Sequence, residues 1–363
     1  MKLQVTQENL NKALANVARI ANSRTTLPIL SNVLLKTVNN RLSIAATNLD
    51  IAITHYVGAK VAQEGSITVP ARLMQDFVSS LPSGPISLEL EDHKLHVVAD
   101  QYMSTINGVS AEDYPVMPAI TDGKTWSLPA QTFKKGLQQV VLAASSDESR
   151  PLLTGVYMHT VDGSLFLAAT DSYRLAEKQL TKTKQETRLL VPASAMQDLL
   201  RVLGDGEETV EVTNDDQQVL FKVSDVELVA RLIEGNYPDY KRLIPASFTT
   251  TATIKKSELS NVTKVSSLFA RESAGSVTIH VDEAEQTVSI HSIASQLGEN
   301  TAQAAAKVQG GGDITLNSRY ILDALGVITA DEVELCFNGK LEACVLRGNG
   351  QDDYTHIIMP LKS

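Results

Sequence analysis

Apolar residues along the chain recur with two different periods, and these periods predict helices and strands. Leu10, Leu14 and Val17 are spaced by three and four residues, which places them on one face of an amphipathic helix. Runs such as 86–90 and 277–281 instead alternate apolar and polar positions and are bounded by Gly, Asp or Asn, which is typical of half-buried antiparallel strands. The pattern therefore predicts an α+β fold with helices packed on a largely antiparallel sheet.

One unit of this pattern occurs three times. The segment 67–81 returns as 189–203 and, more weakly, as 314–328, at offsets of 122 and 125 residues (189 − 67 and 314 − 189). Each copy contains a short strand, a Pro, Asn or Ser helix start and an amphipathic helix. Ala45–Asn48 likewise recurs as Ala168–Asp171.

Further landmarks keep the same spacing. The triplet 113–115 recurs as 236–238, and the first helix face recurs at Phe133, Leu137 and Val140, with a less regular third copy at Leu259, Val262 and Phe269. We therefore predict three repeated domains, each with two helices on antiparallel sheet. Their expected ranges are 1–120, 124–245 and 246–363, with linkers at 118–124 and 245–251.

Composition narrows the function classes. The chain has 363 residues with 32 Lys+Arg against 42 Asp+Glu, a formal net charge of −10, which argues against a protein that grips nucleic acid by bulk charge. A local basic strip on an acidic body stays open. The N-terminal residues hold no apolar signal-sequence core, and no run approaches the 18 apolar residues of a membrane span.

The two cysteines predict a reducing environment. Cys336 and Cys344 flank an Asn338-Gly339 turn signal. A two-residue hairpin there would place Cys336 opposite Leu341 and Cys344 opposite Val333, so the two thiols would not face each other. We therefore expect no disulfide and a cytoplasmic protein.

The chain carries no motif that predicts catalysis. Gly123-Lys124-Thr125 lacks the first glycine of a phosphate-binding loop, so a linker turn is the better interpretation. His93 and His96 would face opposite sides of a strand, and the acidic pairs Glu91-Asp92 and Asp352-Asp353 are more typical of solvated strand ends than of a metal site. We expect no cofactor, no metal and no enzymatic activity; a triplicated scaffold of this kind favours a binding or structural protein.

Several motifs make the resemblance to one family specific over the whole chain. The sequence is similar to the bacterial sliding clamp family, the β subunit of DNA polymerase III, at Thr26–Leu30, Val69–Arg72, Ala168–Leu175, Tyr237–Arg242 and Ile358–Leu361. This resemblance implies three domains of the DNA-clamp fold in each subunit. It also implies a head-to-tail homodimer that closes as a ring around double-stranded DNA, and a non-catalytic processivity factor that tethers the DNA polymerase III α subunit, the clamp loader and repair proteins.

A geometric estimate agrees with two subunits per ring, if the helices face the hole as they do in the family. Twelve helices at about 10 Å spacing form a circle about 38 Å across, which leaves roughly 26–28 Å clear. Six helices from one chain leave only about 8 Å by the same estimate, too little for a duplex.

The resemblance also assigns residues to DNA and to the subunit interface. Arg24 and Arg72 match family motifs and are the better candidates for DNA contact, although basic residues on helices are often only solvated. We expect the edge near Ile106 in the first domain to meet Leu268 and Phe269 in the third domain of the partner. The alternative is that Leu268 and Phe269 are helix-core residues.

A second implied site is a groove between the second and third domains that binds short linear motifs containing Gln, Leu and Phe. An apolar floor rimmed by Arg and Tyr suits such a peptide, although Leu153, Leu175 and Ile357 are also compatible with ordinary core. Ala274, where some members carry a larger residue, and the Lys362-Ser363 ending depart from the family pattern. The implied residues are Arg150, Leu153, Thr170, Ser172, Tyr173, Arg174, Leu175, Pro238, Arg242, Leu243, Asn317, Tyr320, Leu341, Ala343, Ile357, Met359, Pro360, Leu361 and Lys362.

Two other interpretations compete with the clamp. An enzyme acting on nucleic acid through the acidic pairs would show metal-dependent turnover. The chain lacks the catalytic motifs that such an enzyme would carry. The two-domain trimeric clamp of archaea and eukaryotes has two repeats per chain, whereas this chain has three.

Overall fold

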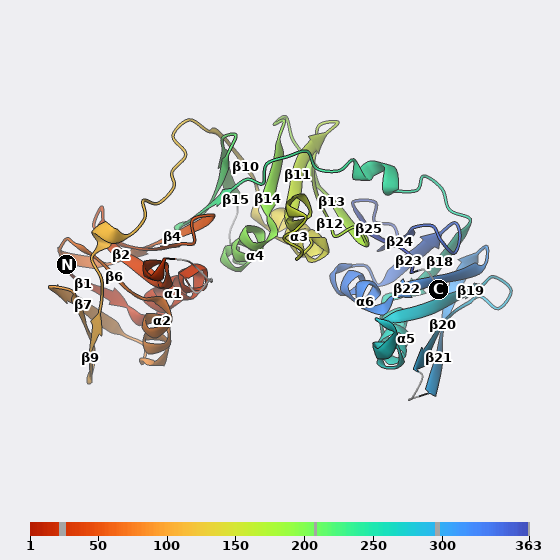
Figure 1. Ribbon diagram of the computed structural model, residues 1–363, viewed down its shortest axis with the longest axis horizontal. Coiled ribbons are helices and arrows are strands. Elements are labelled where there is room, and N and C mark those ends of the chain that lie inside the picture. Colours follow the sequence, from red (N-terminus) through yellow and green to blue (C-terminus); the bar gives the residue numbers. More distant parts are fainter. Residues whose placement is uncertain (22–26, 207–208, 295–297, 362–363) are drawn as a thin grey trace. The chain divides into compact units, whose positions relative to one another are not determined.

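A computed structural model describes residues 1–21, 27–206, 209–294 and 298–361 (Figure 1). The chain divides into two compact units, Met1–Gln131 with Ser194–Leu232, and Thr132–Ala193 with Ile233–Ser363. Strands of the middle repeat enter the sheets of both units. All pairings between the described strands are antiparallel, as the alternating sequence pattern predicts.

The first unit contains two sheets. The five-stranded sheet has the order β5 (Lys60–Gln63), β1 (Lys2–Thr6), β7 (Pro85–Glu91), β8 (Lys94–Ala99) and β9 (Tyr102–Asn107). The eight-stranded sheet has the order β10 (Lys124–Pro129), β15 (Thr209–Asn214), β16 (Gln218–Val223), β17 (Val226–Arg231), β4 (Ile51–Gly58), β3 (Arg41–Thr47), β2 (Asn32–Val38) and β6 (Ser66–Pro70).

Three helices belong mainly to this first unit: α1 (Gln7–Ala21), α2 (Ala71–Ser80) and α4 (Ala193–Val202). Helix α1 packs against α2 and against β2–β4. Its buried face contains Leu10, Leu14 and Val17, which confirms the predicted amphipathic helix. A short 3-10 helix, η1 (Pro28–Ser31), precedes β2.

In the second unit, the described strands form one sheet of twelve. Its order is β14 (Arg188–Pro192), β11 (Gly155–Val161), β12 (Ser164–Thr170), β13 (Arg174–Lys182), β25 (Tyr354–Ile358), β24 (Cys344–Gly348), β23 (Glu332–Phe337), β18 (Thr250–Lys255), β21 (Gly298–Gln309), β20 (Thr287–Ala294), β19 (Ser276–Asp282) and β22 (Gly312–Asn317).

The helices of this second unit are α3 (Ala130–Val140), α5 (Lys256–Phe269) and α6 (Ser318–Val327). Phe133, Leu137 and Val140 of α3 are fully buried, as the repeat predicts. Helix α5 packs on α6 and on β20 and β21 (Figure 1), with Leu259 buried and Phe269 only partly buried. Two short 3-10 helices, η4 (Pro151–Thr154) and η5 (Tyr240–Leu243), lie in the loops of this unit.

The predicted hairpin at the cysteines is wrong. Cys336 pairs with Val345 and Cys344 pairs with Ile358, because residues 338–343 form a longer connection between β23 and β24. The physical reason lies in Asn338, whose Oδ1 accepts from the Thr249 N–H at 2.7 Å and whose Nδ2 donates to the Ser247 carbonyl at 2.9 Å. The Asn338 side chain is thus bonded to the segment 247–249 and does not form a two-residue turn. Both thiols are free and buried.

The Gly123-Lys124-Thr125 segment is not wholly a turn. Strand β10 begins at Lys124, and Thr125 pairs with Thr213 of β15, their hydroxyls 2.9 Å apart. In the same way β18 begins at Thr250, inside the stretch predicted as the second linker. Alternation over 124–129 was too short a signal to separate from the linker before it.

Two buried histidines make the second unit sensitive to acid. Burial lowers the pKa of His159 to about 4, with Lys241 and Arg188 contributing in the same direction. Burial likewise lowers the pKa of His356 to about 3, with Arg174 adding to it. Both rings are therefore neutral in the folded chain near neutral pH.

We predict that the free energy of unfolding falls as the pH decreases from about 6.5 to about 4. Over this range the unfolded chain binds a proton at each histidine, whereas the folded chain does not. The expected loss between pH 7 and pH 5 is about 2 kcal/mol per histidine, measured by urea unfolding followed by circular dichroism. H356Q should remove one histidine's share of this loss. H93Q, a change at an exposed turn, should leave it intact; a native chain with equal stability at both pH values would contradict the prediction.

Candidate peptide-binding surface

A strand junction forms the base of the candidate surface. Strand β13 from the middle repeat pairs with β25 from the third, and Leu175 lies opposite Ile357. One residue beyond this ladder, the Met359 N–H donates to the Tyr173 carbonyl at 2.8 Å. The turn before β13 and the chain after β25 therefore lie side by side.

The turn before β13 is shaped by side chains that bond to its own backbone. The Thr170 hydroxyl donates to the Arg174 carbonyl at 2.6 Å and accepts from the Ser172 N–H at 3.1 Å. Asp171 Oδ1 accepts from the N–H groups of Tyr173 and Arg174, both at 2.9 Å. Ser172 takes a φ of 78°, in the left-handed region. The turn leaves the Tyr173 side chain 56% exposed.

The first repeat builds the same turn, which gives the Ala-Ala-Thr-Asx repeat a physical meaning. The Thr47 hydroxyl donates to the Ile51 carbonyl at 2.9 Å, and Asn48 Oδ1 accepts from the Ile51 N–H at 2.8 Å. Leu49, at the position of Ser172, has a φ of 79°. In the sequence the Thr-Asx pair stands out as a repeat marker, and its side chains are suited to such a turn.

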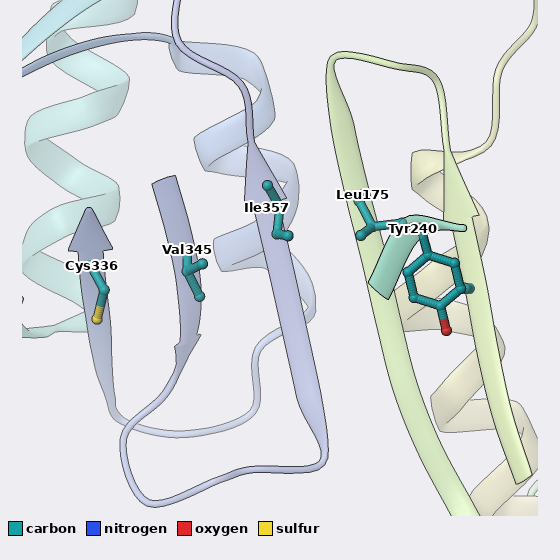
Figure 2. Packing of buried hydrophobic residues seen from close by; sticks show 6 residues of the cluster. Leu175, Tyr240, Cys336, Val345 and Ile357 are labelled. Carbon is teal, nitrogen blue, oxygen red and sulfur yellow. The ribbon is translucent and has the colours of Figure 1, made fainter. Parts of the chain in front are cut away.

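Beneath the turn lies a cluster of buried residues, which we call the junction cluster (Figure 2). Its members come from neighbouring strands and from η5: Ala168, Leu175, Tyr240, Cys336, Val345 and Ile357. Leu175 and Ile357 are only 2% and 1% exposed. These two residues, with Leu153 and Thr170, are thus core as the structure stands, and they shape the base of the surface from below.

Other residues assigned to the groove are exposed. Leu243 of η5 is 48% exposed and Leu341, in the β23–β24 connection, is 71% exposed. Pro238 is also exposed, and Arg242 extends into solvent, where its Nε lies 2.7 Å from Asp239 Oδ2. Ala343 and Met359 are half-buried and pack against the junction cluster.

Arg174 joins the middle repeat to α6 through charge. Its Nε lies 3.0 Å from Asp171 Oδ2 and its Nη1 lies 2.7 Å from Asp323 Oδ2. The guanidinium carbon also lies 4.5 Å from the centroid of the Tyr320 ring. With a side chain only 12% exposed and two carboxylate partners, Arg174 acts mainly as a link within the surface. Asp323 was not predicted from the sequence, where its i+3 spacing from Tyr320 on one helix was the available signal.

The remaining assigned residues lie at the ends of elements. The Arg150 Nη1 donates to the Ser172 hydroxyl at 3.3 Å. Asn317 caps α6 by accepting from the Arg319 N–H at 2.9 Å, and its Nδ2 donates to the carbonyl of Ala274 at 3.1 Å. Pro360 and Leu361 are half-buried, and Lys362 lies outside the described residues.

A buried polar network that was not predicted from the sequence lies behind η5. The His159 Nε2 lies 2.7 Å from the Tyr240 hydroxyl, and this hydroxyl donates to Glu177 Oε2. Lys241 forms an ion pair with the same carboxylate oxygen. Burial and the neighbouring Glu177 raise the pKa of Tyr240 well above its ordinary value, so the phenol stays protonated. Alternating strand residues gave no sequence signal that these groups would meet.

The other assigned residues lie on different elements. Arg72 is an exposed residue of α2, 3.9 Å from Asp76, and Arg24 lies outside the described residues. Ile106 is buried on β9, the last strand of the five-stranded sheet. Leu268 and Phe269 end α5, and Leu268 is 52% exposed.

One acidic pair meets a histidine, since Glu91 Oε2 lies 3.5 Å from His96 Nε2. Over the described ranges, no group of three or more His, Cys, Asp or Glu side chains is arranged to hold a metal ion. His93 lies in a turn and His96 on β8, while Asp353 pairs with Lys178 at 2.5 Å. Among the helices of the described residues, none is long and apolar enough to cross a membrane.

Three domain families match the chain in order. They are the N-terminal domain of the DNA polymerase III beta subunit over residues 1–118, the central domain over 127–239 and the C-terminal domain over 241–362. The beta sliding clamp of Synechocystis is 30% identical and is aligned over 100% of this chain and 99% of its own length.

Solved structures agree with these matches. The DNA polymerase sliding clamp of Bacillus subtilis superposes with a TM-score of 0.93 at 27% identity, and the DNA polymerase III beta subunit of Thermotoga maritima with 0.94 at 26%. Each comparison covers 100% of this chain and 99% of the other. The fold is thus the three-domain clamp fold with helices on antiparallel sheets, and the chain belongs to the beta sliding clamp family, the beta subunits of DNA polymerase III.

Proposed function

We propose that two copies of this chain close head to tail around duplex DNA and that partner proteins dock linear peptides on the surface at the β13–β25 junction. Members of the family are non-catalytic processivity factors that form homodimeric rings with DNA and polymerase. The observation that carries the peptide proposal is the exposure of Tyr173, Leu243 and Leu341 around a packed apolar base. We further propose domain ranges of 1–120, 124–245 and 246–363, and action in the cytoplasm.

The peptide surface combines a rigid base with exposed apolar groups. Pre-formed sites of this kind lose little conformational entropy when an extended peptide binds. Tyr173 is held by the hydrogen-bonded turn, and Leu243 is carried by η5. A peptide with Gln, Leu and Phe side chains offers one polar anchor and two apolar ones, which suits a partly apolar surface bordered by Arg150 and Arg242.

Two free strand edges support the subunit contact. Strand β9 pairs with β8 on one side and ends its sheet. In the described part of the chain, β18 pairs with Ala306–Gln309 of β21, so Gly298–Ala305 is paired with β20 on one side only. Edges of this kind accept a strand from another chain, and the different edges suit a head-to-tail contact.

We predict that Y173A and L341A each weaken binding of a fluorescein-labelled peptide carrying the Gln, Leu and Phe motif. Removing an exposed anchor of this size costs about 1–2 kcal/mol, which is roughly a five- to thirtyfold rise in Kd by fluorescence anisotropy. V161A, a change of an exposed valine at the end of β11, is the matched control and should bind normally. Native affinity in both test variants would contradict the proposed site.

We predict that the double variant L268A/F269A dissociates at concentrations where the native chain is dimeric. Loss of an apolar cluster at the interface lowers the apparent mass from 78.4 kDa, twice the chain mass of 39.2 kDa, toward 39.2 kDa. Mass photometry over a nanomolar dilution series measures this change. L341A should stay dimeric, and a double variant that also stays dimeric at nanomolar concentration would refute the interface.

We predict that R24A and R72A reduce the retention of the ring on DNA without separating its subunits. In a plot of the logarithm of the DNA-binding constant against the logarithm of the salt concentration, each arginine that contacts a phosphate contributes about one to the magnitude of the slope. Each substitution should therefore reduce this magnitude by about one. Retention on nicked circular DNA at several salt concentrations gives the slope. K94A removes an exposed charge on β8 and serves as the control; unchanged slopes for both arginine variants would exclude these contacts.

A further inference from the structure

The chain between the second and third repeats packs against the junction cluster of the twelve-stranded sheet. Tyr240 belongs to the junction cluster, and Tyr237, Ile244 and Phe248 of the same segment pack against it. Tyr240 is followed directly by Lys241, Arg242 and Leu243 within η5. The position of Arg242 and Leu243 therefore depends on how this short helix is held to the sheet.

The attachment of η5 is polar at its centre. Tyr240 is 3% exposed, and its hydroxyl lies between His159 of β11 and Glu177 of β13. A phenol has one hydrogen, which it donates to the Glu177 carboxylate, so its oxygen accepts from His159 Nε2–H. Lys241 donates to the same carboxylate from the exposed side. The chain of donors thus runs from β11 through η5 to β13.

Aromatic packing fixes the orientation of these groups. The His159 ring stacks on Tyr157 at 4.4 Å between centroids, and Tyr157 stacks on Tyr237 at 4.8 Å. Lys241 Nζ lies 4.2 Å from the centroid of Phe166 on β12. Three adjacent strands therefore hold one turn of helix, and the buried hydroxyl at its centre has partners on both sides.

We propose that Tyr240, through His159 and Glu177, is a positioning residue that fixes the Arg242–Leu243 wall of the peptide surface. The inference rests on the proposed peptide binding and adds a residue that the peptide does not touch. Without the hydroxyl, the His159 N–H and the Glu177 carboxylate each lose one hydrogen-bond partner. Helix η5 then samples more conformations. Binding of a peptide must then also order Arg242 and Leu243, and the loss of conformational entropy weakens the affinity.

The decisive test is a double-mutant cycle on peptide affinity. We expect Y240F to raise the Kd of the labelled peptide about three- to tenfold, and to have less than a twofold effect in the L243A background, where part of the positioned wall is already absent. Y354F is the matched control, because it also removes a buried hydroxyl bonded to a histidine, His356, in the same unit. It should lose comparable thermal stability and bind peptide within twofold of the native chain.

A second pair of variants covers the case in which Y240F does not fold. E177A removes the acceptor and should reproduce the loss of affinity and its dependence on Leu243, whereas E177Q keeps an acceptor oxygen for Tyr240 and should restore most of the binding. Native affinity in Y240F, an equal loss in both Leu243 backgrounds, or an equal loss in Y354F would overturn the positioning role alone. A native chain that binds no peptide would overturn the proposed peptide site together with it.

Discussion

Backbone pairing between strands of successive repeats is the constraint on which the rest of the structure depends. Strand β4 of the first repeat pairs with β17 of the second, and β13 of the second pairs with β25 of the third. Each repeat alone would end in exposed N–H and C=O groups, and pairing satisfies them. These ladders also place the turn at Thr47 beside β17 and the turn at Thr170 beside β25. The candidate peptide surface is thus a product of sheet continuity.

At the β13–β25 junction, apolar side chains form the buried base and charged side chains link the neighbouring elements. Apolar cross-strand neighbours such as Leu175 and Ile357 form the packed base, while Arg174 joins the turn to α6 by two carboxylates and an aromatic ring. Side chains held by several partners keep their rotamers when a ligand arrives. Tyr173, Leu243 and Leu341 stay exposed, and in our proposal they contact the partner peptide of a non-catalytic processivity clamp.

The architecture was readable from the chain because periodic patterns report on neighbours in sequence. The three-fold repeat located α1, α3 and α5 through faces such as Leu10, Leu14 and Val17, and it located the strands before α2, α4 and α6. What periodicity does not report is contact between distant segments. The bond from Asn338 to Ser247 replaces the predicted two-residue hairpin with a longer connection. His159, Glu177 and Tyr240 meet because the chain between the second and third repeats packs against the sheet. Such contacts are set by tertiary packing.

The strand edges of β9 and β21 that have no partner among the described residues also affect how long a lone subunit survives. A strand edge with Tyr102 and Met103 exposed is a template for any extended chain, including another copy of the same protein. In the ring proposed above, the partner subunit pairs with this edge, and opening of the ring uncovers it again. In such a ring the risk of aggregation would grow with the time that the edge stays uncovered and with the local protein concentration.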